Sequence, residues 1–106
     1  RGNAKNNLED YYGAIADFNK VIELEPDAAD AYYNRGNAKD DLKDYYGAIA
    51  DFTKAIELDP NYASAYNNRG VAKWYLKDNK GSCEDWRIAA SMGNTSAQNA
   101  LREFCN

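Results

Sequence analysis

The chain has 106 residues, of which 44% are hydrophobic and 28% are charged, and its formal net charge is −4. This length and composition predict one small domain. The acidic balance and the absence of any cluster of lysine and arginine argue against nucleic acid as a partner, because nucleic-acid binders usually carry a basic surface. No apolar run approaches the roughly 20 residues that a membrane-spanning helix needs, so we expect no membrane partner.

A strict repetition dominates the sequence. The segment Arg-Gly-Asn-Ala-Lys at 1–5 returns unchanged at 35–39, and the segment at 10–18 returns unchanged at 44–52. A third, more divergent copy starts at Arg69 with the same offset. A strict period of this length, roughly 34 residues, is typical of solenoids built from helical repeats, which bind partners far more often than they catalyse reactions.

Each copy has two stretches in which apolar residues recur at spacings of three and four, so two helices per repeat are predicted. Pro26 and Pro60 end the second helices, because proline lacks an amide proton and disfavours helical geometry in the residue before it. Lys43 and Asp44 form the expected corner inside the second copy. In chain order, helices are predicted over residues 1–8, 12–25, 29–42, 46–58, 63–76, 80–91 and 95–104.

These elements predict an all-α protein, a right-handed α-solenoid of helix-turn-helix repeats. The expected parts are a partial first repeat at 1–28, a second repeat at 29–62, a third at 63–94 and a capping helix at 95–106. The capping helix has one apolar stripe and one polar face, as the terminal unit of a solenoid requires. Because Arg1 falls inside a repeat, we expect the natural protein to begin upstream of it.

Residues at fixed places in each copy resemble the tetratricopeptide repeat (TPR) family, whose pattern is W-x2-L-G-x2-Y, then A-x3-F, then P. Matching residues are Gly2, Ala14, Phe18 and Pro26 in the first copy, Tyr32, Gly36, Ala48, Phe52, Ala55 and Pro60 in the second, and Tyr66, Gly70 and Ala89 in the third. The resemblance covers essentially the whole chain. The motif residues pack helices against each other, so the resemblance implies the fold more strongly than the function.

The chain departs from the family pattern in a regular way. An arginine stands at the leucine position of each copy, and an aspartate follows each arginine at one constant spacing. In an antiparallel hairpin, residues equidistant from the corner lie at the same height, and the midpoint of Arg35 and Asp51 is Lys43. We therefore predict stacked ion pairs, Arg1–Asp17, Arg35–Asp51 and Arg69–Asp85. The alternative, in which the arginines bind carboxylates in a groove, requires that no aspartate lies within hydrogen-bonding reach.

The same geometry applies to the two cysteines. Cys83 and Cys105 have their midpoint at Asn94, in the break before the last helix. A disulfide is geometrically feasible if their Cα atoms lie within about 4.4–6.8 Å, and it would favour an exported location over the cytoplasm. The alternative is a pair of small buried hydrophobic residues. Two cysteines without a histidine cannot fill a zinc site, and we expect neither a metal nor another cofactor.

In proteins that resemble this family, the first helix of each repeat lines a concave face, which we expect to bind the partner. Asparagine offers a donor and an acceptor to the main chain of an extended peptide, and large aromatic side chains dominate interface energies. The predicted face contains Asn3, Asn6 and Asn7; Asp30, Tyr33, Asn34, Asn37, Asp40 and Asp41; Ser64, Asn67, Asn68, Val71, Trp74 and Tyr75; and Gln98 and Arg102. Alternatively, the asparagines only solvate this surface and Trp74 packs on a neighbouring helix.

The charge of the expected ligand follows from a comparison with the chaperone-binding members of the family, which hold an acidic carboxyl terminus with lysines, arginines and asparagines. Asn3 and Asn34 match the asparagines of that clamp, but Ser64 and Asn68 stand where a lysine and an arginine are required. Three aspartates lie on the predicted rim. We therefore expect a neutral or basic protein or peptide ligand rather than an acidic one.

Catalysis and self-assembly are the other two classes of function to consider. The chain has no histidine and no glycine-rich phosphate loop, so we do not expect an enzyme. The alternative to peptide binding is self-assembly, either as a homo-oligomer or as a structural fragment of a longer TPR array. In that case, the surface that the shortened first helix leaves uncovered packs on upstream repeats or on another copy.

Overall fold

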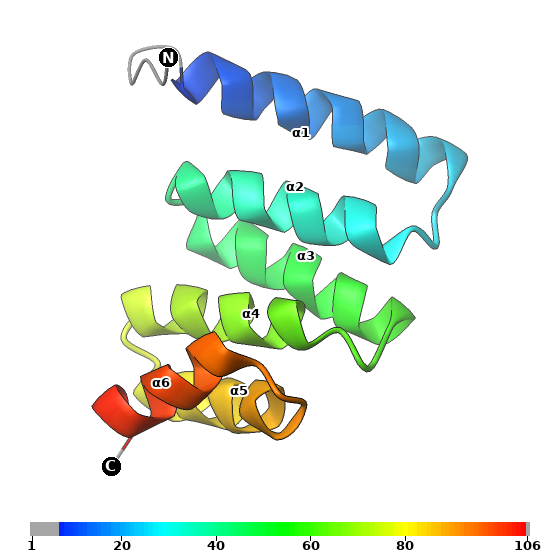
Figure 1. Cartoon of the computed structure of the whole chain (residues 1–106). Helices are drawn as coiled ribbons and strands as arrows, with labels where there is room; N and C mark the ends of the chain where they lie inside the picture. Colours follow the sequence, from blue (N-terminus) through cyan, green and yellow to red (C-terminus); the bar gives the residue numbers. More distant parts are fainter. Residues whose placement is uncertain (1–6, 106) are drawn as a thin grey trace.

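The computed structural model describes residues 7–105, which form six helices and no strand. The helices follow one another in a stack, from α1 at one end to α5 and α6 at the other (Figure 1). Their bounds are α1 Asn7–Leu24, α2 Ala29–Asp41, α3 Tyr45–Leu58, α4 Ala63–Tyr75, α5 Asn79–Ser91 and α6 Thr95–Phe104. The prediction of an all-α solenoid is confirmed. None of the helices in this range is long and apolar enough to cross a membrane.

The corners of the second and third repeats have the same local design. Lys43 and Lys77 adopt φ values of 67° and 68°, and the aspartate that follows each lysine is the N-cap of the next helix. The carboxylate of Asp44 accepts the amide of Gly47 at 3.0 Å, as the carboxylate of Asp78 accepts that of Gly81 at 3.0 Å. Such caps satisfy a backbone donor that has no partner inside the helix.

The predicted break at residues 9–11 in the first copy is wrong, because α1 runs through it without interruption. Glu9 and Asp10 stand where Lys43 and Asp44 form a corner in the second copy. A left-handed residue there would cost about 1–2 kcal/mol, and the described chain has no helix ahead of α1 whose packing would offset this cost. Residues 7 and 8 of the helix predicted over 1–8 belong to α1, and the others lie outside the described residues.

Glycine allows the two helices of a repeat to approach closely. A Cβ atom added to Gly36 would lie 2.8 Å from Cε1 of Phe52, and one added to Gly70 would lie 2.7 Å from Nε1 of Trp86. Around these crossings the core consists mainly of fully buried small residues, which are Ala48, Ala55, Ala65, Ala72, Ala89 and Ala97. The rings of Phe52 and Trp86, which stand at the phenylalanine position of the family pattern, therefore pack directly on the backbone at Gly36 and Gly70.

The third repeat is shorter than the second. Ala31 and Ala65 are buried near the start of α2 and α4 and stand one full period apart. A further full period leads to Asn99, but the equivalent buried residue of α6 is Ala97. α6 is therefore shifted by two residues relative to the period of the first repeats. This shift decides which residues of α6 face the neighbouring helix α4.

Candidate functional site

The arginines at the leucine position are engaged inside their own repeats. Nε and Nη2 of Arg35 donate to the two carboxylate oxygens of Asp51 at 2.8 and 2.7 Å, and Arg69 donates to Asp85 in the same way at 2.9 and 2.8 Å. These hydrogen bonds raise the pKa of both guanidinium groups. The structure thus brings together both described pairs, while Arg1, the predicted partner of Asp17, lies outside the described residues.

Each ion pair extends further than the sequence predicted. Nζ of Lys73 lies 3.1 Å from Asp85, so this carboxylate faces two cations, and Lys39 lies 3.2 Å from Asp51. The remaining guanidinium nitrogen, Nη1, bonds to the previous repeat. Nη1 of Arg35 donates to Asn19, and Nη1 of Arg69 donates to Thr53. Asn19 and Thr53 are themselves one full period apart, which is the signal that could have revealed this link between repeats.

A row of polar side chains joins α2 to α4. Nδ2 of Asn68 donates to Oδ1 of Asn37 at 2.8 Å and to the hydroxyl of Tyr33 at 3.1 Å, while Nδ2 of Asn67 donates to Oδ1 of Asn68 at 3.1 Å. Among the described residues, none bonds to Nδ2 of Asn37 or to Oδ1 of Asn67. This amide row, defined as Tyr33, Asn37, Asn67 and Asn68, therefore keeps a donor and an acceptor for a ligand.

An apolar cavity of about 310 Å³, which we call the aromatic pocket, lies where α4, α5 and α6 meet. Three aromatic rings of the pocket each contact the other two. The centroid distances are 4.8 Å for Trp74–Phe104, 5.8 Å for Trp74–Trp86 and 6.0 Å for Trp86–Phe104. The indole nitrogen of Trp86 donates to the carbonyl of Asn67 at 3.2 Å. The lining residues are Asn67, Val71, Trp74, Tyr75, Trp86, Ser96, Ala100 and Phe104, and none is charged.

The amide row and the aromatic pocket are continuous, because Asn67 belongs to both. Of the residues predicted to face a ligand, the structure brings seven together here, namely Tyr33, Asn37, Asn67, Asn68, Val71, Trp74 and Tyr75. Sequence reasoning missed Trp86, Ser96, Ala100 and Phe104. The two-residue shortening of the third repeat was the available signal, since it changes the face that α6 presents to α4.

Arg102 does not line the aromatic pocket. One full period after Asn68 is Arg102. Because α6 is shifted by two residues, the structural equivalent of Asn68 is Ala100 instead. At about 100° per residue, Arg102 lies roughly 200° around the helix from Ala100, and it donates instead to Asn99 within α6. The same offset misplaces Gln98, whose amide donates to the carbonyl of Ala90 at 3.2 Å.

The other predicted residues lie apart from the pocket. Asp30 accepts the hydroxyl of Tyr62 at 2.8 Å, and burial together with this bond raises the pKa of Tyr62. Asn34 lines a separate cavity between α1 and α2. Asn7 is the first residue of α1. Asn3 and Asn6 lie outside the described residues.

Asp40, one of the acidic residues predicted on this surface, has a partly buried carboxylate. Its Oδ1 atom is buried and has no hydrogen-bond partner among the described residues, and burial together with Asp41 raises its pKa. A carboxyl group with a raised folded-state pKa costs stability when it is ionised. That cost disappears as the pH falls through the raised pKa.

We therefore expect Asp40→Asn to raise the melting temperature at pH 7. The gain should shrink on acidification and be absent below the ordinary aspartate pKa of about 3.9, where wild type and variant are both neutral. Thermal melts at several pH values check this. Asp41→Asn, on an exposed neighbour, is the matched control and should gain less. A lower melting temperature for Asp40→Asn at pH 7 would contradict the expectation.

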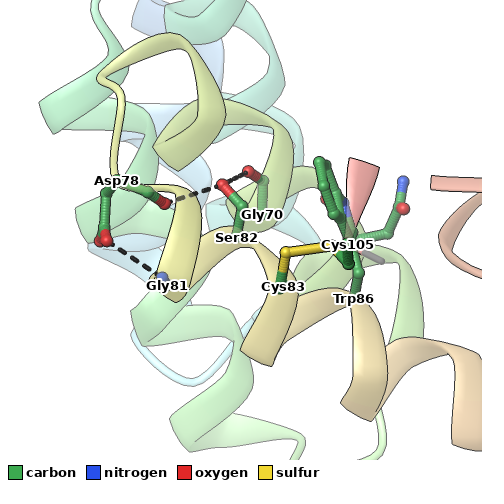
Figure 2. The surroundings of a disulfide bond; sticks show 8 residues. Gly70, Asp78, Gly81, Ser82, Cys83, Trp86 and Cys105 are labelled. Atoms are coloured by element: carbon green, nitrogen blue, oxygen red, sulfur yellow. Dashed lines mark hydrogen bonds between the residues drawn. A yellow bond between two sulfur atoms is a disulfide. The ribbon is translucent and has the colours of Figure 1, made fainter. Parts of the chain in front are cut away.

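A disulfide joins α5 to the end of α6. Cys83 and Cys105 have Cα atoms 5.9 Å apart, and Figure 2 shows the bond beside the ring of Trp86. Ser82, the residue before Cys83 in α5, is fully buried, and its hydroxyl donates to the carbonyls of Gly70 and Asp78 at 2.8 and 3.0 Å (Figure 2). The disulfide thus ties the last helix to the part of α5 that is hydrogen-bonded to α4.

The stacked helical hairpins with a polar and aromatic surface define a helical-repeat scaffold. Sequence models described as tetratricopeptide repeat match residues 29–62 and 52–73, and one described as TPR repeat matches residues 2–39. The chain belongs to the tetratricopeptide-repeat family. No curated protein matches it in sequence.

Solved structures of TPR domains resemble the chain over nearly its whole length. The TPR domain of Arabidopsis OM64 is 29% identical with a TM-score of 0.87, and the match covers 98% of this chain and 88% of that one. The second TPR domain of human RPAP3, in complex with the HSP70 peptide SGPTIEEVD, is 28% identical with a TM-score of 0.84, covering 91% and 82%. The yeast Sti1 TPR2B domain, in its pHsp70 complex, is 30% identical with a TM-score of 0.78, covering 92% and 78%.

Proposed function

We propose that the chain is a non-catalytic scaffold that binds an extended peptide or partner segment on the concave face formed by α2, α4 and α6. The observation that carries this proposal is the continuity of the amide row with the aromatic pocket. The free donor of Asn37 and the free acceptor of Asn67 suit a peptide main chain, whose donors and acceptors alternate. The pocket beside them suits one of its side chains.

Similar TPR structures support a role in binding peptides or proteins in general. The human RPAP3 domain is in complex with an HSP70 peptide and the yeast Sti1 domain is in a pHsp70 complex, and both share the fold of this chain. TPR domains of this kind act as interaction modules, which supports a binding role over a catalytic one.

The ligand that we propose is neutral or basic. The peptide on the human RPAP3 domain ends in Glu-Glu-Val-Asp, whereas the arginine and lysine side chains of α2 and α4 form ion pairs with buried aspartates of this chain. Arg69 and Lys73 both contact Asp85, so neither is free to hold a ligand carboxylate. Asp40 and Asp41 add negative charge near the proposed surface and would repel an acidic segment.

Selection from a random peptide display library, followed by affinity measurements on the peptides obtained, tests the proposal. We expect the selected peptides to be neutral or basic and to lose at least about fivefold in affinity, roughly one hydrogen bond, when Asn37→Ala or Asn68→Ala is introduced. The matched control is Asn61→Ala, an exposed asparagine in the turn before α4. Full binding by both groove variants, or no selected peptide at all, would contradict the proposal.

Self-assembly is the second candidate, and one observation on α1 favours it. Val21 is 40% exposed, although its counterpart one repeat later, Ala55, is fully buried, and Leu24 is 84% exposed. α2 packs on α1, but these apolar side chains of α1 remain exposed in the part of the chain that the structure describes. A concentration series in analytical ultracentrifugation tests this candidate: a dimer that Val21→Lys abolishes supports it, and a monomer at all concentrations contradicts it.

A further inference from the structure

The aromatic pocket depends on the last residues of α6. Phe104 forms one wall, remains 49% exposed, and contacts Trp74 and Trp86 through its ring. The start of α6 is well fixed, because Ala97 is fully buried and the side chain of Asn94 caps the helix. Its end has no following helix in the described chain, and the residue after Phe104 is the disulfide-bonded Cys105.

The lining and size of the pocket define what it can hold. No charged side chain lines it, so a charged ligand group would lose its water without finding a counterion. Its volume of about 310 Å³ is at the lower limit of ligand cavities, which begin near 300 Å³. These properties fit a single large aliphatic or aromatic side chain, and the adjoining amide row offers partners for the backbone on either side of it.

We propose that the aromatic pocket takes one large apolar side chain of the bound segment, and that it does so fully only while the Cys83–Cys105 disulfide is intact. That the side chain comes from a bound peptide rests on the function proposed above. The disulfide holds the last turn of α6 in place, and this turn positions Phe104 over Trp74. When the bond is broken, the end of α6 frays as helix termini do, and the pocket loses a wall.

The chemical step is a simple exchange. A small dithiol attacks the disulfide as its thiolate, and the Sγ–Sγ bond breaks through a mixed disulfide. Two electrons and two protons pass to the protein, leaving a thiol on Cys83 and on Cys105, while the dithiol closes to a cyclic disulfide. Because binding and bond closure favour the same arrangement of α6, an apolar ligand should in turn protect the disulfide from reduction by the same factor.

The test uses two small probes on the full chain, N-acetyl-leucinamide and N-acetyl-tryptophanamide, with the α-amide of N-acetyl-aspartic acid, whose β-carboxylate is free, as the charged control. NMR titrations follow the methyl groups of Val71 and the indole N–H of Trp74. In the oxidised protein, we expect the two apolar probes to shift these signals and the charged probe to leave them unchanged. Reduction with dithiothreitol should weaken binding of the apolar probes by about fivefold or more.

Two sets of variants separate the pocket from the disulfide. The pair Cys83→Ser and Cys105→Ser should bind the apolar probes as weakly as the reduced protein. Phe104→Ala, which keeps the disulfide, should weaken binding similarly, because it removes the pocket wall itself. If the serine pair fails to fold, reduction of the wild-type protein still tests the disulfide. Equal affinity in the oxidised and reduced proteins would overturn the proposal, as would full binding by Phe104→Ala or the absence of any shift in the oxidised protein.

Failure of the redox-dependent pocket and failure of the proposed peptide binding give different results. Shifts at Val71 and Trp74 with the small apolar probes, combined with an unsuccessful peptide selection, would contradict peptide binding and leave the redox-dependent pocket standing. Successful selection of peptides whose affinity does not change on reduction would do the reverse.

Discussion

Replacing Asp85 with alanine should lower the free energy of unfolding by about 3–5 kcal/mol. Asp85 is 2% exposed, and its carboxylate accepts two hydrogen bonds from Arg69 and lies 3.1 Å from Nζ of Lys73. Its removal leaves two cations facing each other in a partly buried site, with no counterion to offset their desolvation. Denaturant unfolding monitored by circular dichroism measures the loss.

The matched control is Glu57→Ala, which removes an exposed carboxylate at 3.9 Å from Lys54. An exposed pair of this kind contributes about 0–1 kcal/mol, so this variant should be nearly neutral. Combining Asp85→Ala with Arg69→Leu, which restores an apolar residue at the leucine position of the repeat, should recover part of the lost stability. A loss below about 1 kcal/mol for Asp85→Ala would show that the pair is not the structural contact that its geometry indicates.

Gly70→Ala is expected to destabilise the protein by about 1–3 kcal/mol, the usual cost of overpacking a core. The added Cβ would lie 2.7 and 2.9 Å from Nε1 and Cδ1 of Trp86, and 3.2 Å from the backbone carbonyl of Ser82. The indole is almost fully buried and hydrogen-bonded to Asn67, so it cannot move aside without disturbing the pocket. Thermal unfolding of the variant checks this expectation.

Gly13→Ala is the control for the same chemical change at a site without contacts. An added Cβ on Gly13 meets nothing within 4 Å, and the position lies in the middle of α1. Alanine should therefore stabilise the protein by about 0.5–1 kcal/mol through its higher helix propensity. If both substitutions had the same sign, close packing at Gly70 would not be the cause of its effect.

The repeat period carried most of the information about the fold. Helix bounds in the second and third copies follow from local signals, such as the proline at Pro60 and the apolar spacing, which require no knowledge of neighbours. The pairing of Arg35 with Asp51 also follows from sequence, because equal distance from a corner fixes height in any antiparallel hairpin. The break expected at Glu9 failed, since a corner forms only where tertiary packing compensates for its left-handed residue.

The candidate site was less predictable because it lies where the period breaks. Trp86 and Phe104 line the aromatic pocket with Trp74, although Trp86 occupies a packing position and Phe104 belongs to the capping helix. Their joint role depends on the shift of α6 by two residues, which a constant offset cannot reproduce. The amide row was easier to predict, because Asn37 and Asn68 lie on α2 and α4, where the period still holds.

An NMR titration of the oxidised chain with display-selected peptides tests the central claim most directly, because it reports the binding surface residue by residue. We expect backbone and side-chain shifts to concentrate at Asn37, Asn67, Asn68, Val71 and Trp74. Shifts centred instead on the exposed face of α1, or an unchanged spectrum at saturating peptide, would contradict it.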